Sequence, residues 1–466
     1  MSDTLREDLQ RRSEALYSTT PIPNINLMAF RSLPEEVHKY HSLVPLEGTD
    51  KERRTSFMGC TSLVYRAVNK ETGDIVTLRR IEGFRLTNET AFAPVDKWNS
   101  LRHPNIAHLR EAFTTRAFGD YSLVFVYDYY PSAQTLYSTH LAPPDPSVLA
   151  ALHSAHAHSQ SSPQSSRQRH YRKNNNGRGA GSSSSLNLPG NGLGVGEPAG
   201  PIEEKTLWSY VVQIVSAMKE AHDKGLALRV LDATKVLVVG KNRIRINCCG
   251  VFDVLGYEHR LSVEAQKYED VQALARLIVA LCTRGQLNIA TQAQQTKDAI
   301  TRTYSPDVWE LIFFLAQPQQ RPLTVDKILE RLGNRVLMEM NAAQGYSDQL
   351  EGELMGELEN GRLVRLMSKL GFINERPDFS HEPRWSETGD RYIIGLFRDY
   401  VFHQVDETGN PVVNLTHVIT CLNKLDAGID EKIMLVSRDE QTCFVVSYKE
   451  LKLCIDSAFG ELARRR

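Results

Sequence analysis

The chain has 466 residues, which is more than one hydrophobic core usually holds, so two or three folded units joined by linkers are expected. Its 41% apolar and 24% charged residues are typical of a soluble protein, and 55 basic against 56 acidic side chains leave a net charge of -1. This balance excludes a general electrostatic attraction to nucleic acid or membranes, and no apolar run reaches the roughly 18 to 20 residues that span a bilayer. The seven scattered cysteines lack the paired spacings of a zinc site, and reduced cytosolic thiols are the simplest interpretation.

The first part of the chain predicts a charged helix followed by a small antiparallel sheet. Residues 2–17 place leucines along one side of a helix, which the turn-forming PIPN ends. From Phe57 to Val126, alternating runs such as SLVYRAV, DIVTLRRI and YSLVFVY are separated by turn signals, as in antiparallel strands. Between these runs, DKWNSLRHPNIAHL predicts a helix that continues into a loop.

Residues 143–200 differ sharply in composition, with Ser, Asn, Gly, Pro and His dominating. Such a segment cannot bury enough apolar surface to offset its chain entropy, so it predicts a disordered insertion. Its basic residues leave RNA contact open as an alternative to a simply solvated segment. These basic residues are Arg167, Arg169, Arg172, Lys173 and Arg178.

The second half of the chain predicts mostly helices. LWSYVVQIVSAMKEAH, EDVQALARLIVALCT, DVWELIFFLAQ and VDKILERLG all have helical periodicity. Beyond Gly333 a leucine stripe on one helix face favours pairing between two chains, with packing inside one chain as the alternative. Four glycines in this segment each cost a helix roughly 1 kcal/mol, so a bent or locally broken helix is expected. They are Gly345, Gly352, Gly356 and Gly361.

The last block, from about Glu375, mixes strand-like runs (IMLVS, TCFVVSY) with three helical segments. It is long enough to form a compact terminal domain.

The landmarks of a protein kinase can be located in the first lobe of this pattern. Kinases place a glycine-rich hairpin over the ATP phosphates, then a lysine on a strand and a glutamate on a helix. In FMGCTSLVYRA the three glycine positions are Phe57, Gly59 and Ser62, so close approach of the backbone to phosphate is compromised. Arg79 in VTLRR replaces the lysine and keeps its charge on a bulkier group. The glutamate position falls near Pro94, so the usual Lys–Glu pair cannot form.

The second lobe lacks the catalytic carboxylates. In HDKGLALRVLDATKVLVV the positions of H-R-D and the later Asn are held by Leu228, Arg229, Val230 and Lys235. The general base is therefore a valine, and one magnesium ligand is a cation. INCCG supplies Cys248 and Cys249 where Asp-Phe is required, which removes the second metal ligand. These losses together predict that the fold is kept while phosphoryl transfer is lost, with no catalytic and no metal-binding residues.

The remaining cleft residues predict ATP binding without metal and without turnover. Phe125 occupies the gatekeeper position, and the backbone of Val126 to Asp128 is expected to face an adenine edge. Arg79 and Lys235 place two fixed positive charges where the phosphates would lie.

Ser132 and Thr135 can reach a ribose in this arrangement. The alternative is a cleft closed by side chains, which Tyr129, Tyr130 and the substituted hairpin favour.

Four segments make the chain resemble the pseudokinase regulatory subunits of the poly(A)-nuclease deadenylation complex. They are LPEEVHKYHSLVPLE, FVYDYYPSAQTL, LWSYVVQIVSAMKEAH and LDATKVL. The resemblance implies an α+β, two-lobed protein-kinase-like fold followed by a coiled-coil helix and a small α/β knob. We expect an N-terminal extension at 1–54, a pseudokinase domain at 55–334, a coiled coil at 335–371 and a knob at 372–466.

The resemblance further implies a cytoplasmic adaptor that forms homodimers through the coiled coil. It would bind the catalytic exonuclease subunit through the coiled coil and knob and bring it to poly(A) tails. Poly(A)-binding protein is a further family partner, although its docking motif is not seen in these residues. The family's nucleotide contacts carry over to Arg79, Asp128, Tyr129, Tyr130, Pro131, Ser132, Ala133, Gln134, Thr135, Thr234 and Lys235.

Two other functions stay open at this point. A pseudokinase scaffold of an unrelated signalling complex would share the cleft but would not predict the helix and knob. An active kinase would need a carboxylate base, which the sequence does not offer at the expected position.

Overall fold

The structure is a computed structural model that describes residues 2–18, 33–47, 56–143, 201–259, 261–317, 323–379, 389–437 and 439–464. Two compact units are distinguished, one of residues 4–342 and one of 343–466 together with the first three residues. The predicted insertion lies outside the described residues, except for its first position. Among the described helices, none has the length and apolarity to span a membrane.

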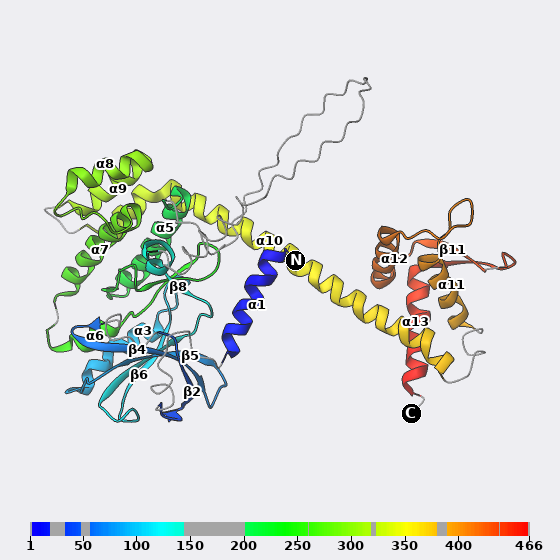
Figure 1. The fold of residues 1–466 in the computed structure, drawn as a ribbon, viewed down its shortest axis with the longest axis horizontal. Coiled ribbons are helices and arrows are strands. Elements are labelled where there is room, and N and C mark those ends of the chain that lie inside the picture. The colour runs from blue at the N-terminus through cyan, green and yellow to red at the C-terminus, as the bar shows by residue number, and fades with distance from the viewer. Residues whose placement is uncertain are drawn as a thin grey trace, which may run out of the picture. The chain divides into compact units, whose positions relative to one another are not determined.

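The first lobe of residues 4–342 is built on an antiparallel sheet of order β1-β2-β4-β5-β7-β6, with β3 paired to β4 (Figure 1). Its strands are β1 (Glu36–Val37), β2 (Tyr40–Pro45), β3 (Ser56–Phe57), β4 (Cys60–Asn69), β5 (Ile75–Ile81), β6 (Leu109–Thr115) and β7 (Ser122–Asp128). The turn η2 (Glu89–Phe92) leads into α3 (Ala93–Ser100), which contacts β6. The predicted antiparallel sheet is confirmed.

Pro94 lies in the first turn of α3, where a proline needs no hydrogen-bond partner for its nitrogen, so it begins this helix and does not break it.

The second lobe is mainly helical, as predicted. It contains α5 (Glu204–Asp223), α6 (Val251–Leu255), η4 (Tyr257–His259), α7 (Val263–Thr283), α8 (Ala293–Thr303) and α9 (Pro306–Ala316). A small sheet joins β8 (Gln134–Thr135), β9 (Val236–Val238) and β10 (Ile244–Ile246), and the short helical turn η3 (Tyr137–Leu141) follows β8. One hydrophobic core, which includes Trp98 and Ile214, continues from α3 into these helices.

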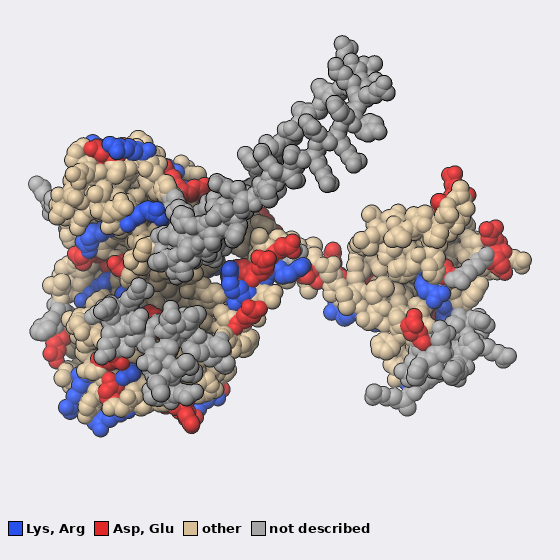
Figure 2. Space-filling model, in the orientation of Figure 1, with Lys and Arg blue, Asp and Glu red and all other residues tan. Residues whose placement is uncertain are grey.

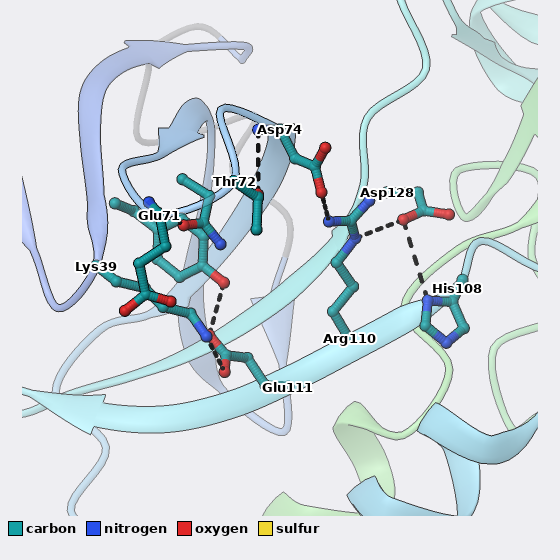
Figure 3. A network of polar contacts seen from close by, with 10 residues as sticks. Lys39, Glu71, Thr72, Asp74, His108, Arg110, Glu111 and Asp128 are labelled. Carbon is teal, nitrogen blue, oxygen red and sulfur yellow. Dashed lines mark hydrogen bonds and ion pairs between the residues drawn. The ribbon is translucent and has the colours of Figure 1, made fainter.

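The sheet begins earlier than the predicted domain boundary at residue 55. β2 pairs with β4, and Tyr40 in β2 is buried. Glu111 of β6 accepts hydrogen bonds from Tyr40 Oη (2.6 Å) and Lys39 Nζ (3.0 Å). Figure 3 shows the contact with Lys39. These contacts make the segment from Glu36 part of the first lobe, and the proposed extension at 1–54 is too long.

An additional helix, α1 (Asp3–Tyr17), precedes this sheet at the predicted position.

The helix α10 (Val325–Phe379) is continuous over 55 residues, so the expected break is wrong. All four glycines named above lie inside it. Helix propagation is cooperative, and both ends of α10 are packed in a core, which offsets the glycine penalties. Its first turns bury Ile328 and Leu332 in the first unit, and its later turns bury Leu366 and Leu370 in the second.

These contacts shorten the predicted coiled coil of 335–371 at both ends. Glu339 still belongs to the first unit, because it accepts a hydrogen bond from Ser209 Oγ of α5 at 2.9 Å.

The knob consists of α11 (Asp390–Phe402), α12 (Leu415–Ala427), α13 (Tyr448–Arg464) and the hairpin β11 (Lys432–Val436) with β12 (Cys443–Ser447). α13 contacts both α11 and α12, and Phe397 and Tyr448 are buried with their rings edge to face. Every predicted helix and strand of this block is present. The knob's core also includes Leu366 and Leu370 of α10, so the domain extends before the predicted start at 372.

Candidate nucleotide cleft and interaction helix

The hairpin that would cover a nucleotide is made by β3 and β4. Its turn is Met58–Gly59, and both residues have positive φ angles, 50° and 84°. Such two-residue turns match the twist of the flanking strands, and Gly59 supplies the conformation without steric strain. Met58 adopts it despite its side chain. Gly59, which stands at a glycine position of the kinase hairpin, therefore serves to form the turn.

The Phe57 side chain of this hairpin is fully buried. The Arg79 guanidinium carbon lies 5.6 Å from the centre of its ring, and Lys235 Nζ lies 4.9 Å from it. The ring of Phe252, from α6, packs at 5.3 Å between centroids. An aromatic side chain thus lies next to both of the cations that were predicted to hold phosphates.

Arg79 is buried on β5, where Ser62 Oγ accepts a hydrogen bond from its Nη1 at 2.9 Å. Glu47 is the acidic group near it, at 3.8 Å from Nη2. Arg79 Nε has no hydrogen-bond partner within the described chain. A buried guanidinium with an unsatisfied donor fits an anionic ligand, because such a donor is costly to leave unpaired.

The second cation, Lys235, is half-buried in the loop before β9 and donates to Thr234 Oγ1 at 3.1 Å. Burial, together with the positive charge of Arg79, lowers the pKa of Lys235. Cys248 stands where a kinase carries its metal-binding aspartate, and burial raises the pKa of this thiol, so it stays neutral at pH 7. The cleft therefore offers cations without the carboxylates that hold magnesium.

The degenerate catalytic loop is held by Asp270 of α7, a carboxylate with no exposed surface. It accepts hydrogen bonds from the backbone N–H groups of Leu228 and Arg229, both at 2.7 Å, and lies 3.0 Å from His222 Nε2. Arg229 has a positive φ of 58°, which these bonds support. Val230 at the base position is buried and has no proton-accepting group.

Arg229 links the loop to α6. Its Nη1 donates to the Phe252 carbonyl at 3.0 Å and lies 3.2 Å from Asp253 Oδ1. Asp253 also accepts a hydrogen bond from Trp98 Nε1 of α3 at 2.8 Å. The Lys–Glu pair of active kinases is missing, and α3 is instead connected to the second lobe by the hydrogen bond from Trp98 to Asp253.

The backbone that was predicted to face the adenine is largely hydrogen-bonded within the sheet. Phe125 lies opposite Arg79 in the ladder, and β7 pairs with β5 and β6 as far as Asp128 and Tyr127. The Asp128 N–H donates to the His108 carbonyl at 3.1 Å. The backbone of Val126 to Asp128 is therefore committed to strand pairing, and the expectation that it faces a ligand is not supported.

The Asp128 side chain, at the end of β7, is engaged in polar contacts (Figure 3). Arg110 Nε donates to its Oδ1 at 2.7 Å, and Arg110 Nη1 donates to Asp74 at 2.8 Å. His108 Nδ1 lies 4.0 Å from the same carboxylate oxygen. This network fixes the start of the segment 128–135 and leaves its later residues as the candidates for ligand contact.

The other predicted contacts are spread along the connection between the lobes. Tyr130 stacks on Arg245 at 4.4 Å, and Ser132, which is exposed, has a positive φ. Gln134 and Thr135 form β8 and pair with β9. Thr135 Oγ1 accepts from the Ser138 N–H at 3.0 Å. Pro131 and Ala133 lie between these residues and are half-buried.

The end of α1 lies against this connection. Its last carbonyls accept hydrogen bonds from Arg66 Nη1 (to Leu16, 2.6 Å) and Tyr129 Oη (to Ala15, 3.4 Å). Arg and Tyr donors at a helix C-terminus satisfy carbonyls that have no partner inside the helix. Sequence reasoning assigned Tyr129 to the nucleotide and did not anticipate this role.

A second candidate surface is the middle of α10. Leu350, Leu354 and Leu358 follow each other at four-residue intervals and are all exposed, Leu354 and Leu358 by about 60%. Met355 is equally exposed. On the face shown in Figure 2, basic and acidic side chains are interspersed within each unit, so no field of one sign dominates that face. Among the described residues, no cluster could hold a metal ion.

Known proteins are similar to this chain over both the pseudokinase unit and the part formed by α10 and the knob. A family of Pan3 C-terminal knob domains matches residues 325–462. A PAN2-PAN3 deadenylation complex subunit PAN3 of Cryptococcus neoformans is 44% identical over 99% of this chain, and one of Dictyostelium discoideum is 39% identical over its whole length. The chain spans 63% and 55% of the length of these two relatives.

Solved structures agree with these relatives. The Neurospora crassa PAN3 pseudokinase and C-terminal region, solved in a complex with PAN2, matches with a TM-score of 0.77 at 35% identity and full coverage of both chains. The chain belongs to the PAN3 family. A Drosophila melanogaster PAN3 pseudokinase also matches, with a TM-score of 0.69 at 37% identity over 92% of this chain and all of that one.

This membership confirms the predicted family and the predicted pseudokinase fold followed by a helix and knob. Sequence reasoning missed Phe252, because its role comes from where the fold places it and not from its residue type. Phe252 follows the Cys-Cys-Gly motif by two residues, and its contact with Phe57 joins the lobes. The available signal was the aromatic residue at the first glycine position of the hairpin, a side chain too large for a phosphate-covering loop.

Proposed function

We propose that this PAN3-family chain is a non-catalytic adaptor subunit of a cytoplasmic poly(A)-specific ribonuclease complex. It pairs with a second copy through α10, binds the catalytic exonuclease PAN2 through α10 and the knob, and brings it to the poly(A) tails of mRNA. It performs no phosphoryl transfer itself. The name of the related Neurospora structure, a complex of PAN2 with the PAN3 pseudokinase and C-terminal region, supports this partner.

The observation that carries the proposal is the exposed apolar row in the middle of α10. A single helix of 55 residues continues from the pseudokinase unit into the knob, and Leu350, Leu354 and Leu358 in its middle are exposed. Large apolar side chains aligned on one face of a helix are typical of helix pairing. A pseudokinase scaffold without such pairing would not need this row.

Poly(A) shortening by PAN2 at limiting concentration tests the adaptor function. We expect the full chain to stimulate shortening and a chain ending at Ala342 to give no stimulation. This end point keeps Glu339, whose hydrogen bonds belong to the first unit, and removes the free part of α10 with the knob. Equal stimulation by both chains would refute an adaptor that acts through α10 and the knob.

We further propose that the cleft binds ATP without a metal ion and without turnover. The unsatisfied Arg79 Nε and the half-buried Lys235 fit the phosphates, and the residues from Tyr129 to Thr135 with Thr234 would surround the nucleoside. The position of one magnesium ligand is a lysine, and that of the other is the neutral thiol of Cys248.

Titration of ATP in EDTA and in magnesium tests this proposal. Equal binding in both conditions, lost in Arg79→Ala, is expected. A requirement for magnesium, or no binding in either condition, would refute it.

A further inference from the structure

The buried Phe57 ring lies beside the two cations to which the proposed function assigns the phosphates. It lies close to both cations, with Lys235 Nζ 4.9 Å and the Arg79 guanidinium carbon 5.6 Å from the ring centre. Cations are attracted to the electron-rich face of an aromatic ring, and burial strengthens this attraction. The ring therefore stabilises, from within the chain, two charges that would otherwise attract a bound anion.

The hairpin that carries Phe57 also contacts the second lobe. Phe57 packs on Phe252 of α6 at 5.3 Å between ring centres. Phe252 is in turn held by Arg229, whose Nη1 donates to its carbonyl and whose guanidinium lies 5.7 Å from its ring. The retained arginine of the catalytic loop thus supports the surface on which Phe57 rests.

The hairpin turns tightly at its tip. In its described part, β3 pairs with β4 through Ser56 with Thr61 and Phe57 with Cys60. Its turn places Met58 in a backbone conformation that residues with a side chain rarely adopt, and the Met58 side chain is exposed. The uncommon backbone conformation of Met58 stores strain at the tip of the hairpin, which a movement of the hairpin can release.

We propose that Phe57 is an internal plug of the nucleotide site, and that a nucleotide binds only when the β3–β4 hairpin withdraws this ring from Arg79 and Lys235. This inference rests on the proposed nucleotide binding. The apparent affinity then equals the intrinsic affinity reduced by the fraction of molecules in which the ring is withdrawn. Removing the ring therefore tightens nucleotide binding, although it deletes part of the site's wall.

The test is a titration of a fluorescent ATP analogue in EDTA with wild-type protein, Phe57→Ala and Phe252→Ala. Phe57→Ala is expected to bind about tenfold tighter, as for a plug withdrawn about one tenth of the time. Phe252→Ala removes the support of the plug and is expected to bind tighter by a smaller factor. Phe118→Ala is the matched control, because Phe118 holds Arg80 at 4.1 Å outside the cleft. It is expected to bind as the wild type does.

A second measurement follows the ring itself. A single 4-fluorophenylalanine at position 57 gives a fluorine NMR signal whose sensitivity to H2O against D2O reports exposure. ATP is expected to move this signal from the buried to the exposed range. A signal that stays buried while ATP binds would overturn the plug, whatever the affinities of the variants.

The outcomes separate this inference from the proposed nucleotide binding. Wild-type binding with no gain in Phe57→Ala and Phe252→Ala overturns the plug and leaves ATP binding standing. Binding by Phe57→Ala alone supports the plug and refutes ATP binding by the wild-type chain. No binding by either protein overturns both.

Discussion

The nucleotide cleft of the pseudokinase unit and the middle of α10 differ in whether their key side chains have partners inside the chain. In the cleft, groups that an active kinase presents to ligands have partners inside the chain: the two cations face Phe57, and Arg229 binds α6. In the middle of α10, Leu354 and Leu358 are each about 60% exposed.

This difference indicates where each region gets its stability. Internal partners let a cleft persist after the loss of metal-binding carboxylates, because buried charge without compensation is destabilising. Exposed leucines contribute to stability only when another surface buries them. The pseudokinase unit is therefore expected to respond to mutation by unfolding, and the helix by losing a partner.

The largest effect is expected from Asp270→Ala, which would break the cleft's internal network. The buried carboxylate accepts from two backbone N–H groups and contacts His222, so its removal leaves buried donors unsatisfied. We expect the free energy of unfolding of this unit to fall by about 3 to 5 kcal/mol, as for other broken buried charge networks. Urea denaturation followed by circular dichroism measures it.

The control for this prediction is Asp223→Ala, at an exposed acid on α5 that pairs with Lys219. It should change the unfolding midpoint far less, because exposed pairs contribute little. An Asp270→Ala protein as stable as this control would contradict the role assigned to the buried carboxylate.

The second prediction concerns α10 and sharpens the contrast, because it should change assembly without changing folding. Leu354→Glu and Leu358→Glu should each weaken self-association by at least about tenfold, since burying a leucine contributes about 1.5 to 3 kcal/mol. Sedimentation equilibrium measures the dissociation constant. Leu453→Glu, at an equally exposed leucine on α13, is the matched control and should leave association unchanged.

Self-association that is insensitive to both α10 variants would show that the helix is not the pairing surface. A lower unfolding midpoint of the monomer in either variant would show that these leucines are packed within the chain.

The sequence predicted this contrast only in part, and the reason differs between the regions. Helical periodicity is local, so α5, α7, α11 and α13 could be located from their apolar spacing. The continuity of α10 through four glycines depends on anchoring at both ends by Leu332 and Leu366, which local propensity does not report. The cleft residues, such as Arg79 and Lys235, could be identified from their spacing relative to the sequence motifs of protein kinases.

Their contacts did not follow from spacing. The substitution of glycine by Phe57 was visible, but its ring could have pointed to solvent. Only the tertiary structure shows it next to Arg79 and Lys235. Likewise, Asp128, the last residue of β7, was assigned to the nucleotide from the family's contacts, and its pairing with Arg110 depends on the neighbouring strand β6.

A smaller, severalfold effect is expected from pH on nucleotide binding. Burial lowers the pKa of Lys235 below the ordinary 10.5, so the lysine loses its charge at a lower pH than an exposed one. Affinity for ATP should therefore be constant near neutral pH and fall as pH rises through this lowered pKa. Lys235→Arg should remove the alkaline decline, because arginine keeps its charge.

Isothermal titration at a series of pH values tests this expectation. An alkaline decline that persists unchanged in Lys235→Arg would assign the titration to another group and remove Lys235 from the phosphate site.

The smallest effect is expected at the polar network that holds the start of the segment 128–135. Arg110→Ala removes the pairs with Asp128 and Asp74, all of which are partly exposed, so solvent screening keeps the loss of stability at pH 7 small. Hydrogen bonding by Arg110 is the main cause that lowers the pKa of Asp74 below its usual 3.8. A lowered carboxyl pKa stabilises the fold above the unfolded value and ceases to do so as pH falls through the folded one. The difference between wild type and Arg110→Ala should therefore shrink below about pH 4 in urea denaturation, whereas a difference that persists there would indicate that Arg110 acts through packing.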